Sequence, residues 1–157
     1  KNFINFLEKP NLENTSNMCQ AANLAGEAIN ISRTTAPHAT SYPFTSIYNI
    51  SHGHAVSLTL NKFLRFNYEN LSKASCKFNL EDRFKILFNL SNTKNFSSFD
   101  MYLQNLKQKA KLEDNFEKLG IDINKDYQKI ISKINLRRLA NNPVDLNSND
   151  IKKIILN

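Results

Sequence analysis

The segment AANLAGEAINISRTTAPHATSYPFTSIYNISHGHAVSLTL, from Ala21 to Leu60, has the most informative pattern in this sequence. All three histidines of the chain lie in it: His38, His52 and His54. No Asp or Glu occurs between Ala28 and Tyr68. Imidazoles gathered in a stretch without carboxylates suggest metal ligands that need a charged partner from another part of the protein.

Outward from this segment, apolar residues recur at helical spacing over nearly the whole chain. The Ala-rich part predicts a helix from about residue 14 to 31, and a turn at 34–37 begins a second helix, in which Pro43 limits the regularity. Residues 49–51 predict a break before a third helix that begins near His52. Further helices are predicted at about residues 80–90, 97–112, 125–134 and 148–156, with an amphipathic start at 3–7. Because no strand or hairpin pattern occurs, the sequence predicts an all-α bundle of about seven helices.

Length and composition limit the classes of function. With 157 residues, 41% of them hydrophobic, the chain fits a single helical domain over residues 1–157. Three glycines are too few for a glycine-rich phosphate loop. The net charge of +7 comes from scattered residues, so nucleic-acid binding is not expected, and no apolar run is long enough to span a membrane. Two isolated cysteines, Cys19 and Cys76, favour a reducing cytoplasm.

The spacing of the histidines allows two interpretations. His38 is predicted in one helix and His52 opens the next, so we expect the two imidazoles to approach each other across the turn at 49–51. His54 follows two residues later, on roughly the opposite side of the helix, and cannot easily share a metal with His52. Spacing alone is more typical of hydrogen-bonded core or surface histidines than of a metal site.

The string TAPHATSYPFTSIYNISHGHAVSLTL, preceded by AANLAGEAINIS, resembles the C-terminal helical domain of the iron-containing alcohol dehydrogenase family. In that family one metal-ligand histidine lies in a helix, and a second follows in a short turn that opens the next helix. The resemblance implies that His38 and His52 are metal ligands. Gly53, in the same turn, would let a cofactor or a neighbouring backbone come close.

Two more parts of the sequence extend the resemblance. Many members of the family carry a further histidine one turn after the first ligand, where it helps proton transfer, and the corresponding residue here is Tyr42. The Asn142-Pro143 pair and the helix expected around Asp150 look like the closing segment of the family. The segment NISRTTAPHATSY is similar to the corresponding segment in a branch of the family that includes phosphonoacetaldehyde reductases.

The resemblance implies an NAD(P)-dependent alcohol dehydrogenase or aldehyde reductase that uses Fe²⁺ or Zn²⁺ and acts on a small alcohol or aldehyde. Two alternatives remain. One is the dehydroquinate-synthase family, which has a similar H-G-x-A-V turn, usually with Glu where this chain has His54. The other is a non-catalytic helical binding module. Arg33 either favours an anionic substrate such as a phosphonate or is a solvated charge at a helix end.

Two features of the family pattern have no counterpart in the sequence. The other two family ligands are an Asp and a His one turn apart on an earlier helix, and no histidine precedes His38. The nucleotide-binding α/β domain, which binds most of NAD(H) or NADP(H), is missing as well. We therefore expect a C-terminal fragment of a larger two-domain enzyme, as the start at Lys1 inside an amphipathic segment also suggests.

Such a fragment is expected to be inactive by itself and to expose the surface that normally meets the other domain. We expect an apolar patch there that favours a homo-oligomer. Its predicted residues are Phe3, Phe6, Leu24 and Ile47.

Overall fold

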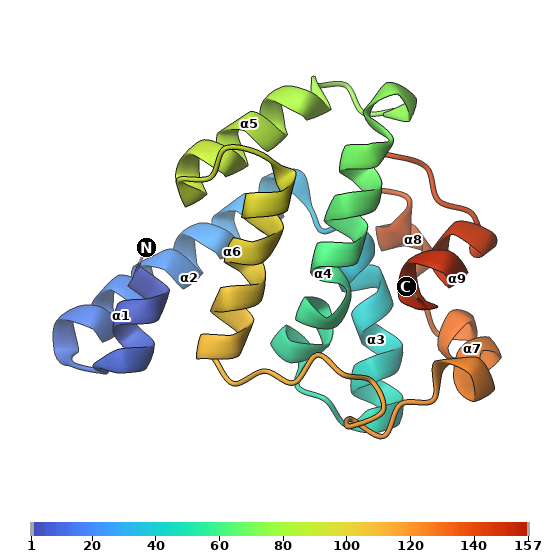
Figure 1. Cartoon of the computed structure of the whole chain (residues 1–157), viewed down its shortest axis with the longest axis horizontal. Coiled ribbons are helices and arrows are strands. Elements are labelled where there is room, and N and C mark those ends of the chain that lie inside the picture. Colours follow the sequence, from blue (N-terminus) through green and yellow to red (C-terminus); the bar gives the residue numbers. More distant parts are fainter. Residues whose placement is uncertain (1, 157) are drawn as a thin grey trace.

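The computed structural model describes residues 2–156, which form nine α-helices and one short 3-10 helix (Figure 1). Within this range no strand forms, and extended backbone pairs at one isolated bridge, between Ala74 and Val144. The elements are α1 (Asn2–Glu8), α2 (Leu12–Ser32), α3 (Ala36–Tyr48), α4 (His52–Glu69), the 3-10 helix (Leu71–Lys73), α5 (Leu80–Ser91), α6 (Phe96–Lys109), α7 (Ile123–Ser132), α8 (Leu136–Leu139) and α9 (Ser148–Leu156). The prediction of an all-α bundle is confirmed.

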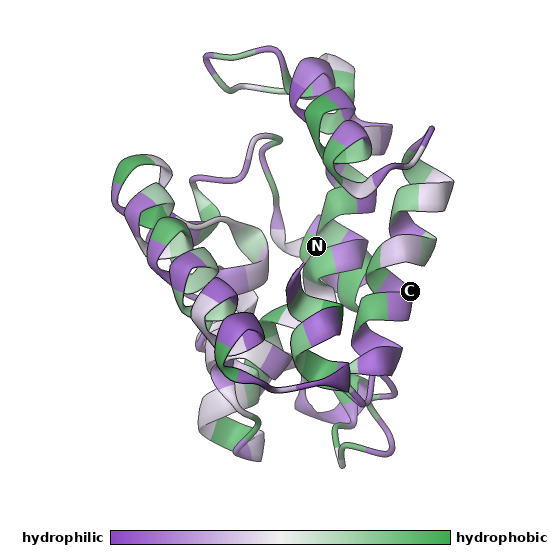
Figure 2. Cartoon of the chain, turned by 90° about the vertical axis from the view of Figure 1, so that its left-hand side faces the viewer, coloured by the Kyte–Doolittle hydropathy of each residue, from purple (hydrophilic) through white to green (hydrophobic). Residues whose placement is uncertain are grey.

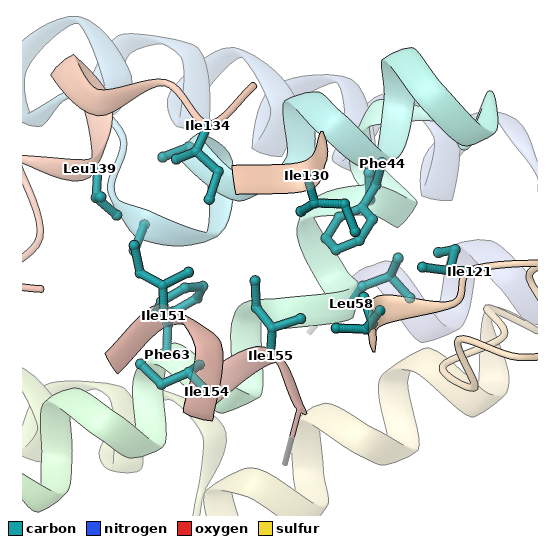
Figure 3. Close-up of a cluster of buried hydrophobic side chains, with 14 of the residues drawn as sticks. Phe44, Leu58, Phe63, Ile121, Ile130, Ile134, Leu139, Ile151, Ile154 and Ile155 are labelled. Atoms are coloured by element: carbon teal, nitrogen blue, oxygen red, sulfur yellow. The ribbon is translucent and has the colours of Figure 1, made fainter. Parts of the chain in front are cut away.

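The α3–α4 pair forms the centre of the molecule, with α7, α8 and α9 packed on one side (Figure 1). An isoleucine-rich cluster joins these helices, and Figure 3 shows its side chains pointing toward one another. Phe44 of α3, Phe63 of α4, Ile130 of α7 and Ile155 of α9 are each at most 1% exposed. Full burial of one such side chain contributes roughly 1.5–3 kcal/mol. The cluster therefore holds α3 and α4 in a fixed relation.

An aromatic cluster fixes α5 and α6 against the second half of α4. The Tyr68 ring lies 5.1 Å from the Phe84 ring and 4.9 Å from the Phe96 ring, measured between centroids. Both are normal separations for aromatic pairs in protein cores. The buried carboxylate of Asp100 on α6 adds an ion pair to Arg65 on α4, with an N–O distance of 2.7 Å.

Helix α2 differs from the other long helices, because none of its residues is buried. It begins after Asn11, whose side chain accepts a hydrogen bond from the backbone N–H of Asn14 at 2.9 Å. Its contacts with the rest of the molecule are mainly with α1. Seen from the side of α1 and α2, the helices carry apolar and polar residues on the same turns (Figure 2). On α2 several of these apolar side chains are exposed, Leu12 and Ile31 among them.

Pro43 lies inside α3 without ending it. A proline has no N–H, so the carbonyl of Ala39, four residues earlier, receives no helical hydrogen bond from it. The N–H of Asn135 donates to that carbonyl instead, at 3.3 Å. At Pro43 the missing helical hydrogen bond is therefore replaced by one that connects α3 to the segment before α8.

Three details differ from the sequence predictions. Helix α8 and the 3-10 helix were not expected, because elements of four and three residues are too short to show periodicity. Ile47, expected in the exposed apolar patch, is half-buried and packs against the isoleucine-rich cluster. Phe3 and Phe6 are half-buried, whereas Leu24 is 63% exposed, as expected. Lys1 lies outside the described residues.

None of the helices within residues 2–156 combines the length and the apolar character that crossing a lipid bilayer requires.

Candidate metal centre

His38 and His52 face each other where α3 and α4 meet. His38 lies in the first turn of α3, and His52 is the first residue of α4. Asn49 ends α3 in the left-handed conformation, with φ of 55°, so that the chain turns back within three residues. The two imidazole centroids are 5.5 Å apart. The expected approach of the two rings across this turn is confirmed.

Ser41 orients the ring of His52. Its hydroxyl donates to the backbone carbonyl of His38 at 2.8 Å, and the same oxygen lies 3.4 Å from Nδ1 of His52. Because the single hydroxyl proton is directed to the carbonyl, the Ser41 oxygen acts as an acceptor toward His52. This assigns the proton of His52 to Nδ1 and leaves the lone pair of Nε2 available to a metal ion.

His38 lies in an environment that disfavours its protonated form. Burial lowers the pKa of His38 below its ordinary value, and the neighbouring charges of His52 and Arg138 lower it further. A metal ion binds only the neutral imidazole, so a lowered pKa keeps this ligand available at neutral pH.

His54 does not belong to this pair. Its Nε2–H donates to the backbone carbonyl of Glu113 at 2.7 Å, on the loop after α6. The hydrogen bond draws the half-buried imidazole toward that loop, so His54 serves a structural contact.

The structure brings Tyr42 to the histidine pair. Its ring centroid lies 6.3 Å from that of His52 and 5.3 Å from the guanidinium carbon of Arg138. Gly53 is exposed beside His52, and a Cβ built there meets nothing within 4 Å among the described residues. Space for an approaching group is therefore present at Gly53, although packing within residues 2–156 does not itself require a glycine.

The donor chemistry fits a divalent transition metal only in part. Imidazole nitrogen is a good ligand for Fe(II) and Zn(II), and one His38–His52 pair supplies two donors. Within residues 2–156, however, no group of three or more His, Cys, Asp or Glu side chains is arranged to hold a metal ion. A complete coordination sphere needs donors from outside these residues.

Two residues of this site were missed in the sequence analysis. Ser41 lies three residues after His38, on the same face of α3, and helical spacing was a signal that could have found it. Arg138 reaches Tyr42 from α8 across about a hundred positions of sequence. No local pattern indicates that contact.

Comparison with known proteins places the chain in a family. Residues 1–157 match the C-terminal part of the Fe-containing alcohol dehydrogenase family. Over 49 residues, 31% of this chain, the sequence is 43% identical to phosphonoacetaldehyde reductase of Streptomyces viridochromogenes, and the match covers 12% of that protein.

A solved structure has a similar fold. The crystal structure of sulfoacetaldehyde reductase from Bifidobacterium kashiwanohense, in complex with NAD⁺, aligns over 92% of this chain and 36% of its own, with a TM-score of 0.73 and 23% identity. The chain thus spans about a third or less of the length of these relatives. The chain belongs to the Fe-containing alcohol dehydrogenase family and corresponds to its C-terminal part.

Proposed function

We propose that this chain is the metal-binding helical part of an NAD(P)-dependent alcohol dehydrogenase or aldehyde reductase, with His38 and His52 as two of its metal ligands. The observation that carries the proposal is the pair of imidazoles 5.5 Å apart on the packed α3–α4 hairpin. The family match and the aldehyde substrates named for the two relatives support it.

The roles of the chain's own residues follow from their positions. His38 and His52 would hold the metal, and Ser41 would keep the His52 ring turned with Nε2 toward it. When bound, a divalent ion supplies Lewis-acid polarisation of a carbonyl oxygen, and a nicotinamide supplies hydride transfer. Tyr42 is the group of this chain that we expect to exchange a proton with the substrate oxygen. Gly53 leaves room for the cofactor beside His52.

The rest of the coordination sphere and most of the nucleotide site belong, in this proposal, to a second domain. A charged carboxylate from that domain would offset the dehydration of a divalent ion, which two neutral imidazoles cannot do. By itself the chain is therefore expected to bind metal weakly and to have no dehydrogenase activity. We also propose a cytoplasmic enzyme, since both cysteines are free thiols.

Of the alternatives, the dehydroquinate-synthase-like lyase is disfavoured by the family that matches. A non-catalytic helical module is distinguished by its metal chemistry. Such a module gives no chemical reason for two imidazoles to lie 5.5 Å apart.

The test is a titration of the chain with Zn²⁺, followed through the ¹⁵N chemical shifts of the three imidazoles. We expect the ¹⁵N signals of His38 and His52 to shift at the same Zn²⁺ concentrations, with the shift of His52 at Nε2. The signals of His54 should remain unchanged. His38→Ala and His52→Ala should each weaken Zn²⁺ binding about tenfold or more, by loss of a ligand.

His54→Ala is the matched control, because it removes an imidazole two residues from His52 and should leave Zn²⁺ binding unchanged. A shift at His54 with none at His52 would mean that the wrong histidine has been chosen. If no imidazole shifts at millimolar Zn²⁺, the non-catalytic module becomes the better explanation.

A further inference from the structure

A hollow of about 350 Å³ lies where the end of α2 meets α8. Three arginines line it: Arg33, Arg137 and Arg138. The other lining residues are Ile29, Thr34, Asn135 and Asn141, so none of the described lining residues is acidic. Within residues 2–156 none of the three arginines forms a salt bridge. The hollow therefore has a concentrated positive charge without a counter-charge of its own.

Arg138 is held in place by structure rather than by a carboxylate. Its Nη1 donates to Oγ1 of Thr34 at 3.1 Å, and its guanidinium lies against the ring of Tyr42. Its backbone N–H donates to the side chain of Asn135 at 3.0 Å, and Asn135 is in turn bonded to α3. A guanidinium has five N–H donors, so most of them stay available to a ligand.

Arg33 adds a second, independent observation. Its backbone has φ of 63° and ψ of −173°, a conformation that residues other than glycine adopt at a cost of order 1–3 kcal/mol. Such strain concentrates at ligand sites, where the surrounding structure enforces it. Here it lies at the junction of α2 and α3, on the wall of the hollow.

The hollow adjoins the candidate metal centre. The Tyr42 ring contacts both the guanidinium of Arg138 and the ring of His52. Thr34, which binds Arg138, lies four residues before His38 in the chain. A small molecule with a charged end and a reactive end could therefore meet the arginines and the histidines at once.

We propose that the hollow lined by Arg33, Arg137 and Arg138 binds the tetrahedral anionic head group of the substrate, a phosphonate or a sulfonate, while its aldehyde carbon faces His38 and His52. This inference rests on the proposed function. In a two-carbon aldehyde the head group is one methylene away from the carbonyl, so adjoining subsites must hold both ends. The forked donors of arginine match the oxygens of such an anion.

The probes are the two alcohols that reduction of these aldehydes yields, 2-hydroxyethylphosphonate and 2-hydroxyethanesulfonate, with 1-propanol as an uncharged control and NAD⁺ as a competing phosphate source. Binding is followed on the chain through the arginine Nε–H and the Thr34 and Asn141 amide signals. We expect both anions to shift these signals and 1-propanol not to shift them.

Arg138→Gln is expected to weaken binding of both anions about tenfold or more, because charge-assisted hydrogen bonds are lost. Arg138→Lys should recover part of it, since the charge remains but the fork does not. Arg137→Gln, at an exposed residue, keeps the test valid if Arg138→Gln unfolds the chain, and it should weaken binding as well. Arg83→Gln, an exposed arginine of α5 outside the hollow, is the matched control and should change nothing.

Binding that is unchanged in both Arg138→Gln and Arg137→Gln overturns the inference. If the anions shift the Arg83 signal as much as the signals of the hollow, the binding is nonspecific attraction to a basic chain. If NAD⁺ shifts the signals of the hollow and the two anions do not, the hollow belongs to the cofactor site. The Zn²⁺ titration is independent of these results. Anion binding without Zn²⁺ shifts at His38 and His52 would leave an anion site and reject the proposed function, whereas the reverse would reject the anion site alone.

Discussion

Helices α2 and α4 are both long, with 21 and 18 residues, but they differ in what keeps them folded. No residue of α2 is buried, and Leu24 and Ile31 are 63% and 88% exposed. Helix α4 buries one side chain in nearly every turn: Ala55, Leu58, Thr59, Phe63 and Asn67. Therefore α4 is held by tertiary packing, whereas α2 depends on the helix propensity of its alanines and on its N-cap.

The difference shows where this fold can place chemistry. His38 and His52 are positioned by the packed α3–α4 pair, which opens only when the core opens. Helices in proteins owe most of their stability to tertiary packing, so α2, which buries no residue, is expected to open at a much lower free energy. Near the site, α2 contributes Ile29 and, directly after its last residue, Arg33, both of which line the arginine hollow.

The largest difference should appear on truncating an apolar side chain in each helix. Phe63→Ala removes a fully buried ring and should lower the free energy of unfolding by about 3–5 kcal/mol. Leu24→Ala on α2 should change it by no more than about 0.5 kcal/mol. Urea denaturation followed by circular dichroism measures both. A cost at Leu24 comparable to that at Phe63 would show that α2 is packed in solution.

A smaller effect is expected for a buried hydroxyl. Oγ1 of Thr40 donates to the carbonyls of Ala36 and Pro37, so the hydroxyl of Thr59 donates to Thr40, 3.0 Å away. Thr59→Val should cost about 1–3 kcal/mol, because it leaves a buried acceptor unpaired between α3 and α4. Thr15→Val, at an exposed position of α2, makes the same chemical change and should cost less than about 0.5 kcal/mol. Equal costs in urea titrations would contradict the comparison.

The third prediction acts on α2 alone. Gly26 lies inside the helix, and a Cβ there meets nothing within 4 Å in the described part of the chain. Gly26→Ala should stabilise α2 locally by about 0.8–1 kcal/mol, through helix propensity. Amide hydrogen exchange should slow in α2 and stay unchanged in α4. Gly120→Ala is the contrasting control, since φ of 72° at Gly120 makes an alanine there strained. Slower exchange in both helices would show that they unfold together.

The smallest expected effect is a pH dependence of the free energy of unfolding that arises from the partly buried Lys62 of α4. Burial lowers the pKa of Lys62, with Asp114 opposing and Lys107 reinforcing that shift, while the ammonium donates to the carbonyl of Ile155. A lysine with a lowered pKa loses its proton more readily in the folded state. The wild-type chain should therefore gain stability relative to Lys62→Met as the pH rises toward the ordinary pKa of lysine.

Denaturation of the two chains at a series of alkaline pH values checks this sign. Lys125→Met, which removes an exposed ammonium of α7, is the control and should show no such trend. A relative loss of stability at high pH in the wild type would contradict the assignment of Lys62 as desolvated.

Much of the fold and the centre of the candidate site could be predicted from the residues alone. Helical periodicity and short polar joints predicted the long helices, since both are local properties of the chain. The approach of His38 to His52 was expected because a three-residue turn joins their helices, but His38 lies in the first turn of α3, ten residues before its end, so the packing of α3 against α4 is also needed to bring the rings together. The expected separation of His54 also holds, since it bonds to Glu113 instead.

Other features depend on contacts between segments that are far apart in the sequence. Ile47 is half-buried because it packs against the isoleucine-rich cluster, although it was expected in the apolar patch that meets another domain. From the local sequence alone, Pro43 is expected to weaken α3. In the structure, the Ala39 carbonyl, which Pro43 leaves without a helical hydrogen bond, accepts one from the N–H of Asn135.

The sequence by itself therefore determined the helices of this protein, because helical periodicity is a short-range property, and it singled out His38 and His52 as candidate partners. Only the tertiary structure decided that Arg138 lies beside Thr34 and Tyr42, 104 and 96 positions away in the chain, in a hollow with two other arginines. The physical reason is that such a contact is set by the packing of α8 against α3, and periodicity within a helix carries no information about its distant neighbours.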